Sequence, residues 1–255
     1  MILIDTHCHL YLEEFRQDIE GVISRAKQIG VEKFYLPAID SGVIKEMFLL
    51  EEKYPGVCIP MAGLHPCSVK ENYREELDIV EHWLNKRKFV AIGEIGLDFY
   101  WDKTFTDQQY DAFKLQMRWA LNKKLPIVIH TRSAMEETIE TVKPFAEKGL
   151  RGIFHCFSGN ASQAARIIEM GFYLGIGGVV TYKNSGLAEV VKEISLENIV
   201  LETDAPYLTP VPFRGKRNES SYLEYILNKI AEIKGLPVDE IASATTVNAK
   251  KIFEN

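Results

Sequence analysis

The chain has 255 residues, of which 46% are hydrophobic, and its formal net charge is −6. This length and apolar content suit one domain of barrel size, and the acidic balance argues against a surface that coats nucleic acid. No apolar run reaches the ~20 residues that cross a bilayer, so we expect no membrane partner. No polar or Gly/Ser-rich linker divides the chain, which predicts a single domain over residues 1–255.

The first residues and the cysteines both favour a cytoplasmic protein. The start of the chain has no basic lead and no small-residue cleavage pattern of a secretion signal. Cys8, Cys58, Cys67 and Cys156 are scattered and form no C-x-x-C pair, which favours reduced thiols over a disulfide framework. We expect Cys8 and Cys156 to pack between strands and helices, facing away from the histidines beside them. The sequence sets no oligomeric state, and a monomer is compatible with it.

Eight short apolar runs are typical of strands that are buried on both faces. In chain order they cover residues 1–9, 32–39, 57–65, 89–98, 126–132, 152–159, 172–178 and 199–206. Helical spacing predicts helices between and after them, at residues 15–29, 43–54, 74–86, 106–123, 135–148, 161–170, 187–194, 221–234 and 238–253. Thr106 and Gln109 have the spacing of a capping box at the start of the fourth helix.

Strands that alternate with helices are typical of parallel β/α units. Eight such units in ~250 residues predict an α/β fold, namely a single (β/α)8 TIM barrel with an additional C-terminal helix. The alternative is an open doubly wound sheet, which normally has a glycine-rich turn after its first strand. The corresponding turn here, DTHCHLYLEEF, has no glycine, so the barrel is favoured.

Side chains that bind metal ions recur at the carboxyl ends of the predicted strands. His7 and His9 would share one face of the first strand, because alternate residues point to the same side. The others, in chain order, are His65, Glu94, His130, His155 and Asp204. The remaining histidine, His82, lies within a predicted helix. All strands of a barrel end at one mouth, so we expect these strand-end residues to converge there.

Each of these residues alone has an ordinary explanation, such as a hydrogen-bonded loop histidine or a turn-forming aspartate before Pro206. Together, polar groups left unpaired in a buried mouth would cost about 1–3 kcal/mol each, and a cation satisfies several at once. Imidazoles and carboxylates suit Zn, Mn, Co or Ni better than an all-oxygen site, and Mg stays open as an alternative. The donors are too many for one tetrahedral centre, so we predict two divalent metal ions.

Seven segments of the chain resemble, in order and over nearly its whole length, the TatD group of metal-dependent deoxyribonucleases of the amidohydrolase superfamily. They are DTHCHL, GLHP, GEIGLDFY, LPIVIHTR, HCFSG, LETDAPYLTP and RGKRNES. The resemblance implies that Glu94 bridges two metal ions, one held with His7, His9 and Asp204 and the other with His130 and His155. One departure is the stretch RNESSY, because the family often has proline soon after this asparagine.

The resemblance also implies the activity, a hydrolase that cleaves phosphodiester bonds of DNA as a 3′–5′ exonuclease on single strands or ends. Asp204 would orient the attacking water and take its proton, Glu94 would hold both ions, and His65 would lie near the scissile phosphate. Asp5 and Glu202, one alternation deeper than His7 and Asp204, could fix a histidine tautomer or make a structural hydrogen bond inside the barrel.

Further residues near the predicted mouth are candidates for contacts with a nucleic acid. Arg132, Arg214, Lys216 and Arg217 could bind phosphate, because a forked guanidinium matches phosphate oxygens. A solvated basic loop is the ordinary alternative for the last three. Tyr100 and Trp101 could stack on a base, or could pack on the barrel rim.

Two other functions stay open. The first is hydrolysis of a small amide, lactone or ester, including an aminoacyl-tRNA ester, because one barrel supports many chemistries. The basic stretch 214–217 favours a substrate with phosphates over a neutral one. The second is a metal-dependent DNA-binding module without catalysis, which the proton-accepting aspartate argues against.

Overall fold

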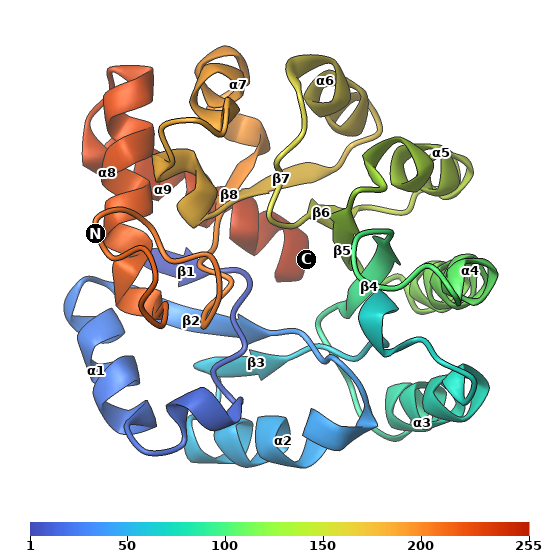
Figure 1. The fold of residues 1–255 in the computed structure, drawn as a ribbon. Helices are drawn as coiled ribbons and strands as arrows, with labels where there is room; N and C mark the ends of the chain where they lie inside the picture. The colour runs from blue at the N-terminus through green and yellow to red at the C-terminus, as the bar shows by residue number, and fades with distance from the viewer. Residues whose placement is uncertain (255) are drawn as a thin grey trace.

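Eight parallel strands form the inner wall of the protein over residues 1–254, the part that this computed structural model describes. They are β1 (Leu3–Asp5), β2 (Val31–Leu36), β3 (Cys58–Pro60), β4 (Ile92–Asp98), β5 (Ile127–Arg132), β6 (Gly152–Phe154), β7 (Tyr173–Ile176) and β8 (Ile199–Leu201). Strands β1–β3 and β4–β8 are hydrogen-bonded in sequence order. Parallel bridges from Ala62 to Ile92 and from Cys8 to Ala205 join the two sheets, so the wall closes into a barrel (Figure 1).

Helices follow the strands and cover the outside of the barrel (Figure 1). They are α1 (Ile19–Gln28), α2 (Ile44–Lys53), α3 (Tyr73–Lys86), α4 (Thr106–Lys123), α5 (Met135–Ala146), α6 (Ala161–Glu169), α7 (Leu187–Glu193), α8 (Leu223–Lys234) and α9 (Val238–Phe253). The predicted (β/α)8 TIM barrel with an additional C-terminal helix is confirmed. Within residues 1–254, no helix has the length and apolar character needed to span a membrane.

The core has two layers that follow from strand alternation. On β5, Ile127 and Ile129 belong to the larger apolar cluster, between barrel and helices, whereas Val128 belongs to a smaller cluster inside the barrel. Helix α9 closes the inner cluster, and its Phe253 ring stacks on Tyr35 at 4.0 Å between centroids. Since α9 seals one end of the barrel with apolar side chains, a polar site is left to the other end.

Helix α9 is fastened to the beginnings of β1 and β8. Thr246 Oγ1 donates to the carbonyl of Ile2 at 2.8 Å, and Asn248 Nδ2 donates to the carbonyls of Leu196 and Ile199 at 2.7 and 2.8 Å. The helix therefore lies at the amino ends of the strands, behind the barrel in Figure 1. The carboxyl ends face the viewer of that figure.

Three local expectations were wrong. The first strand ends at Asp5 rather than at residue 9, so His7 and His9 lie in the turn beyond β1. The first helix begins at Ile19, after a short 3-10 turn. Helix α4 has no side-chain cap, because Gln109 instead exchanges hydrogen bonds with the backbone of Asp98 at 2.9 and 3.1 Å. A tertiary partner thus replaces the local capping box.

Candidate metal centre

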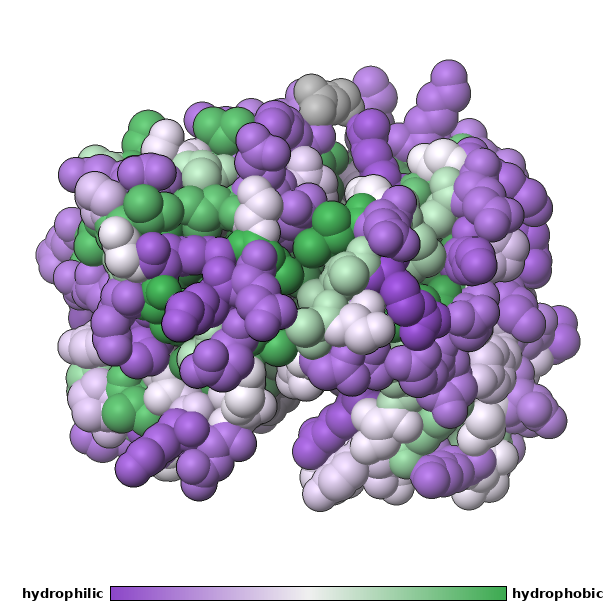
Figure 2. Space-filling model, turned by 90° about the horizontal axis from the view of Figure 1, so that it is seen from above, coloured by the Kyte–Doolittle hydropathy of each residue, from purple (hydrophilic) through white to green (hydrophobic). Residues whose placement is uncertain are grey.

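A cavity of about 760 Å³ opens at the carboxyl ends of the strands. Its walls include most of the predicted strand-end residues, namely His9, His65, Glu94, His130, His155 and Asp204. His7 is fully buried beside them. In the view from above, the surface is mostly hydrophilic, and a notch at the lower edge of Figure 2 lies on the face that points to the viewer in Figure 1. The strand-end residues therefore meet in one site.

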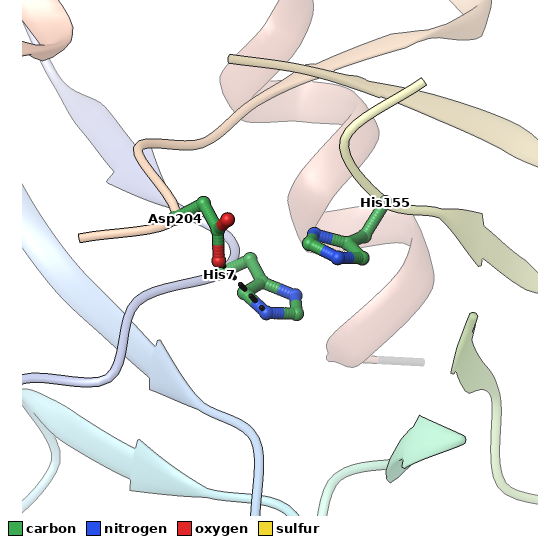
Figure 3. Close-up of side chains that lie close together, drawn as sticks. All are labelled: His7, His155 and Asp204. Carbon is green, nitrogen blue, oxygen red and sulfur yellow. Dashed lines mark ion pairs between the residues drawn. The ribbon is translucent and has the colours of Figure 1, made fainter. Parts of the chain in front are cut away.

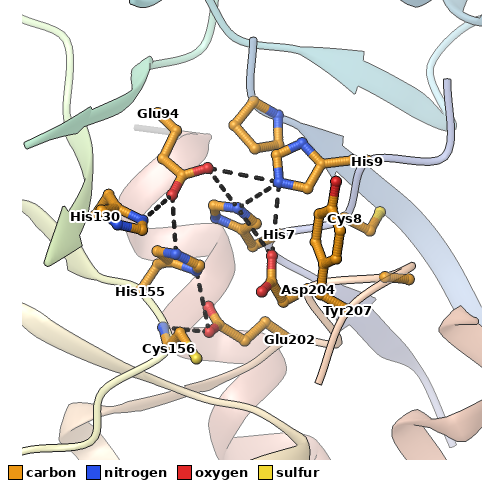
Figure 4. A network of polar contacts seen from close by, with 12 residues as sticks. His7, Cys8, His9, Glu94, His130, His155, Cys156, Glu202, Asp204 and Tyr207 are labelled. Carbon is orange, nitrogen blue, oxygen red and sulfur yellow. Dashed lines mark hydrogen bonds and ion pairs between the residues drawn. The ribbon is translucent and has the colours of Figure 1, made fainter. Parts of the chain in front are cut away.

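Glu94 lies at the centre of this site and joins two groups of donors (Figure 4). Its Oε2 is 3.2 Å from His7 Nε2 and 3.5 Å from His9 Nε2. Its Oε1 approaches three other imidazole nitrogens, at 2.8 Å to His130 Nδ1, 3.0 Å to His155 Nε2 and 3.3 Å to His65 Nε2. Each carboxylate oxygen thus faces a different group, as a bridging ligand requires.

Asp204 completes the group around His7 and His9. Its Oδ1 is 3.6 Å from His7 Nε2 and 3.5 Å from His9 Nε2, while the two histidine nitrogens are 3.2 Å apart. His155 stacks on His7 with ring centroids 3.7 Å apart, so the two groups are in direct contact (Figure 3). The paired histidines of the opening segment do converge, although they reach the site from a turn.

The turn after β8 is held in an unusual conformation that presents Asp204. The backbone of Asp204 has φ +56°, which non-glycine residues rarely adopt. Its N–H donates to the carbonyl of His7 at 2.9 Å. On the other side of the turn, Asn218 Nδ2 donates to the carbonyls of Thr203 and Tyr207 at 2.7 and 2.6 Å. Asn218 therefore ties both flanks of Asp204 together.

Several of the candidate ligand histidines are oriented by a second polar group. Tyr11 donates to the carbonyl of Pro37 at 2.5 Å, so its oxygen is free to accept from His9 Nδ1 at 2.8 Å. That leaves His9 Nε2 as the nitrogen facing Glu94 and Asp204. Such partners fix the tautomer and ring orientation of metal-binding histidines.

Glu202 and Asp5, for which the sequence left open a role in fixing a histidine tautomer, differ in their contacts. Glu202 Oε1 lies 3.5 Å from His155 Nδ1 and also accepts from the backbone N–H of Cys156. Asp5 contacts no histidine ring among its hydrogen-bond partners in the described chain. It accepts from the backbone of His7 and from Thr203 and Ser220, so it braces the backbone around the site.

Burial and close contacts shift the pKa values of the metal-free site. Burial alone would raise the pKa of Glu94, but His65, His155 and His7 hold it well below its ordinary value. Burial lowers the pKa of His9, but hydrogen bonds with Asp204 and Glu94 outweigh this effect and raise it to about 9. At neutral pH, the histidines with raised pKa values therefore carry protons. In the metal-free site these protons balance the negative charges of Glu94 and Asp204, as bound cations would otherwise do.

The donor set fits metal ions. Three overlapping groups of described residues bring their ligand atoms within 4.8 Å of one another, namely His7–His9–Glu94, His7–His155–Asp204 and His65–Glu94–His130. Imidazoles with shared carboxylates suit borderline divalent ions, and the two groups on either side of Glu94 fit a pair of ions. His65 offers a further donor to the second group.

The predicted substrate-contact residues divide into two sets. Trp101 and Arg132 line the cavity, and the Arg132 guanidinium lies 3.9 Å from the ring centroid of Tyr100. The basic residues of the stretch 214–217 are absent from the cavity lining. Arg217 pairs with Asp18 at 2.7 and 2.8 Å, and Arg214 stacks on a tyrosine ring. Phosphate binding by these basic residues stays a prediction.

The two cysteines next to ligand histidines differ. Cys8 is fully buried in the apolar cluster between barrel and helices, as expected. Cys156 lines the cavity instead, and its backbone has φ +45°. The expectation that Cys156 packs behind the strands was therefore wrong, because the turn after β6 breaks the alternation on which it depended.

Sequence reasoning missed three residues that shape the site, namely Tyr11, Asp98 and Asn218. Asp98 Oδ2 lies 2.9 Å from His130 Nε2. Two of the three carried a signal, because Tyr11 continues the two-residue spacing of His7 and His9, and Asp98 follows Glu94 by four residues on β4. Asn218 has no local signal, because its partners are 11 and 15 residues away.

Comparisons with known proteins show to which family the chain belongs. The family model "TatD related DNase" matches residues 4–254. The uncharacterized metal-dependent hydrolase YabD of Bacillus subtilis is 42% identical over 99% of both chains, and the 3′–5′ ssDNA/RNA exonuclease TatD of Pectobacterium parmentieri is 32% identical over 98% of this chain and 99% of its own. The crystal structure of the TatD homologue YjjV of Escherichia coli K12 superposes with a TM-score of 0.93 at 31% identity, covering 99% of this chain and 98% of its own. The chain belongs to the TatD family of metal-dependent hydrolases.

Proposed function

We propose that this metal-dependent hydrolase is a deoxyribonuclease that removes nucleotides from the 3′ end of single-stranded DNA with two divalent ions. The observation that carries the proposal is Glu94, whose two oxygens each face a separate group of histidine donors. A pair of ions on either side of a carboxylate is the centre that many phosphodiester-cleaving enzymes use. The similarity to a 3′–5′ ssDNA/RNA exonuclease at 32% identity supports the substrate class and the polarity.

The residues divide into two ligand sets. His7, His9 and Asp204 would hold one ion, and His130 and His155 the other, with Glu94 shared between them. When bound, Mg, Mn, Zn, Co or Ni supplies the Lewis acidity that activates water and balances charge on the phosphodiester. Of the two carboxylates, Asp204 is the better placed to accept a proton, because both line the cavity but Asp204 retains 9% exposure and Glu94 only 2%.

Asp204 would orient the attacking water and accept its proton through the carboxylate. Burial raises the pKa of Asp204, but the hydrogen bond with His9 and the nearby His155 and His7 hold it below its ordinary value. The carboxylate is therefore ionised at neutral pH and ready to accept. His65, on the opposite wall, would contact a phosphate oxygen or serve as a further ligand of the second ion.

The mouth of the cavity suits a flexible strand end. Tyr100 and Trp101 are 55% and 67% exposed, and Arg132 lies over both rings. Exposed aromatic rings stack on unpaired bases, and a guanidinium can grip a phosphate. On the other side, Tyr207 also lines the cavity and is 47% exposed. A net charge of −6 disfavours wrapping of duplex DNA, so single strands are the expected substrate.

The proposal is tested with protein stripped of metal by a chelator. Release of nucleotides from labelled single-stranded DNA should be absent, and should return with Mn or Mg. A 3′ label should leave as mononucleotide at once, whereas a 5′ label should leave last. His130→Ala and Asp204→Asn should abolish release, and His82→Ala, on the exposed face of α3, should not change it.

Cleavage that persists in the chelator, or in Asp204→Asn, would contradict the proposed mechanism. A panel of lactones, cyclic amides and aminoacyl-tRNA should be run in parallel. Turnover of one of these without release of nucleotides from DNA would replace the nuclease by the corresponding hydrolase. Metal-dependent DNA binding with no turnover on any substrate would leave only a binding function.

A further inference from the structure

We propose that Asp98 is a positioning residue that sets the tautomer of the ligand histidine His130 and, through its other oxygen, holds the aromatic turn at the mouth of the cavity. The proposal concerns a carboxylate that neither ligand set contains. Its consequence for metal binding rests on the two-ion centre proposed above, whereas its consequence for the tautomer does not.

Asp98 and Glu94 lie on opposite edges of the His130 ring. Asp98 Oδ2 is 2.9 Å from Nε2, and Glu94 Oε1 is 2.8 Å from Nδ1. Asp98 is the last residue of β4 and is only 1% exposed, so water does not compete for this contact. An ionised carboxylate only accepts hydrogen bonds, so Asp98 favours a proton on Nε2, whereas Glu94 favours one on Nδ1 while no ion is bound. An ion on Nδ1 would displace the proton there and leave His130 neutral, with its remaining proton on Nε2 facing Asp98.

The second oxygen of Asp98 holds the turn that follows β4. Oδ1 accepts the backbone N–H groups of Tyr100 at 2.9 Å and of Trp101 at 3.1 Å. These are the aromatic residues with which Arg132 stacks. One carboxylate thus connects a ligand of the second ion with the rim where a base would stack.

Asp98 itself is held by a rigid element. The Gln109 side chain, which projects from α4 and is 3% exposed, accepts from the Asp98 N–H at 2.9 Å and donates to its carbonyl at 3.1 Å. Helix α4 packs on β4. The carboxylate is therefore fixed from behind, as a group that orients a neighbouring ring should be.

The substitution Asp98→Asn separates the two tasks of the carboxylate, because an amide has the same size but only one acceptor oxygen. If that oxygen stays on Tyr100 and Trp101, the NH₂ group faces His130 Nε2 and requires a lone pair there. The ring proton then moves to Nδ1, where it blocks the ion. If the amide flips, His130 keeps its tautomer, but the NH₂ group opposes the two backbone N–H groups and the turn is released.

Metal content gives the first readout. Wild-type protein dialysed against buffered Zn²⁺ should retain two ions, measured by mass spectrometry of bound metal. Asp98→Asn should hold the second ion about 10–100-fold more weakly, the usual effect of removing such a partner. The matched control is Asp102→Asn, in the same loop, because Asp102 pairs with Lys70. This control should bind both ions as the wild type does.

The second readout is the tautomer itself, measured by long-range ¹H–¹⁵N correlation on the imidazole nitrogens. Wild-type protein loaded with Zn²⁺ should show His130 protonated at Nε2 and bound through Nδ1. In metal-free protein at a pH where His130 is neutral, Glu94 competes for the ring proton, so Asp98→Asn should have a larger fraction of the Nδ1–H form than the wild type. A wild type found wholly in the Nδ1–H form would show that Asp98 does not hold the proton, even if the variant does not fold.

Either of two results would overturn the proposal. One is a neutral wild-type His130 found wholly in the Nδ1–H form, and the other is an Asp98→Asn protein that keeps both the wild-type tautomer populations and wild-type affinity for the second ion. A wild type that binds a single ion would count against the two-ion centre of the proposed function. The tautomer of metal-free His130 would still decide the role of Asp98.

Discussion

The substitution Asn218→Ala tests how the turn that carries Asp204 is held. Asn218 is fully buried, and its side chain makes three hydrogen bonds to backbone groups. Nδ2 donates to the carbonyls of Thr203 and Tyr207 at 2.7 and 2.6 Å, and Oδ1 accepts the N–H of Glu219 at 2.9 Å. Alanine removes all three bonds at once.

The magnitude follows from the groups left without partners. A buried polar group that loses its partner costs about 1–3 kcal/mol. Tyr207 is 47% exposed, so water can reach part of the vacated space, and we expect a total loss of about 2–5 kcal/mol in the free energy of unfolding. Asp204 directly follows Thr203, and its own backbone has φ +56°. Relaxation of the turn should therefore also displace the Asp204 carboxylate and weaken binding of the first ion.

The assay is urea unfolding of metal-free protein at fixed pH, followed by titration with Zn²⁺. Asn218→Asp keeps the size and the acceptor but loses both donors, so it should be destabilised as well. The matched control is Asn85→Ala, because Asn85 is exposed and its side chain accepts a hydrogen bond from Lys123 at the surface. If Asn218→Ala unfolds within about 0.5 kcal/mol of the wild type, the turn is held by other contacts and this reasoning fails.

Three further outcomes are expected. Burial lowers the pKa of His9, but the nearby carboxylates raise it to about 9, and the pKa of His155 is also raised. Both histidines must lose a proton when metal binds. The affinity for metal should therefore rise with pH from about 6 to 9, and the heat of metal binding should depend on the buffer. Tyr11→Phe should lower the affinity for the first ion about tenfold in a Zn²⁺ titration without unfolding the protein. Gly96→Ala, whose Cβ would lie 1.9 Å from the His130 carbonyl, should cost more than about 2 kcal/mol in urea unfolding. The first prediction would be contradicted by heats of metal binding that do not depend on the buffer. The second would be contradicted by unchanged Zn²⁺ affinity in Tyr11→Phe, and the third by unchanged stability of Gly96→Ala.

The fold was predictable because burial repeats with a regular period. Apolar runs gave the strands and helical spacing gave the helices, since a parallel barrel buries both faces of each strand. The ends of the first and eighth strands were less predictable. His7, His9 and Asp204 follow apolar runs without a glycine or proline between, yet the chain leaves the sheet at Asp5 and Leu201. Contacts between the two turns, absent from any local pattern, decide this.

The candidate ligands were predictable for a related reason, whereas the residues that hold them in place were not. Histidine and carboxylate side chains at strand ends are informative because every strand ends at the same mouth. Gln109 shows the limit, since its spacing from Thr106 suggested a helix cap, but its side chain clamps Asp98 across 11 residues. A sequence shows which side chains reach the mouth, whereas their pairing depends on distances between strands.

Successive residues on one face of strand β5 pack in the core, reach the candidate metal site and line the mouth of the cavity. Val128 points into the apolar plug that α9 closes, His130 reaches Glu94, and Arg132 lies at the mouth over Tyr100. These residues are two apart, so each step moves about 6–7 Å along the strand on the same face. The position of a residue along the strand therefore determines how deep in the barrel its side chain lies. A one-residue shift of β5 would turn His130 towards the helices and remove both a candidate ligand and a rim contact. Glycine at position 96 permits the present register, because a Cβ there would lie 1.9 Å from the carbonyl oxygen of His130, its partner on β5.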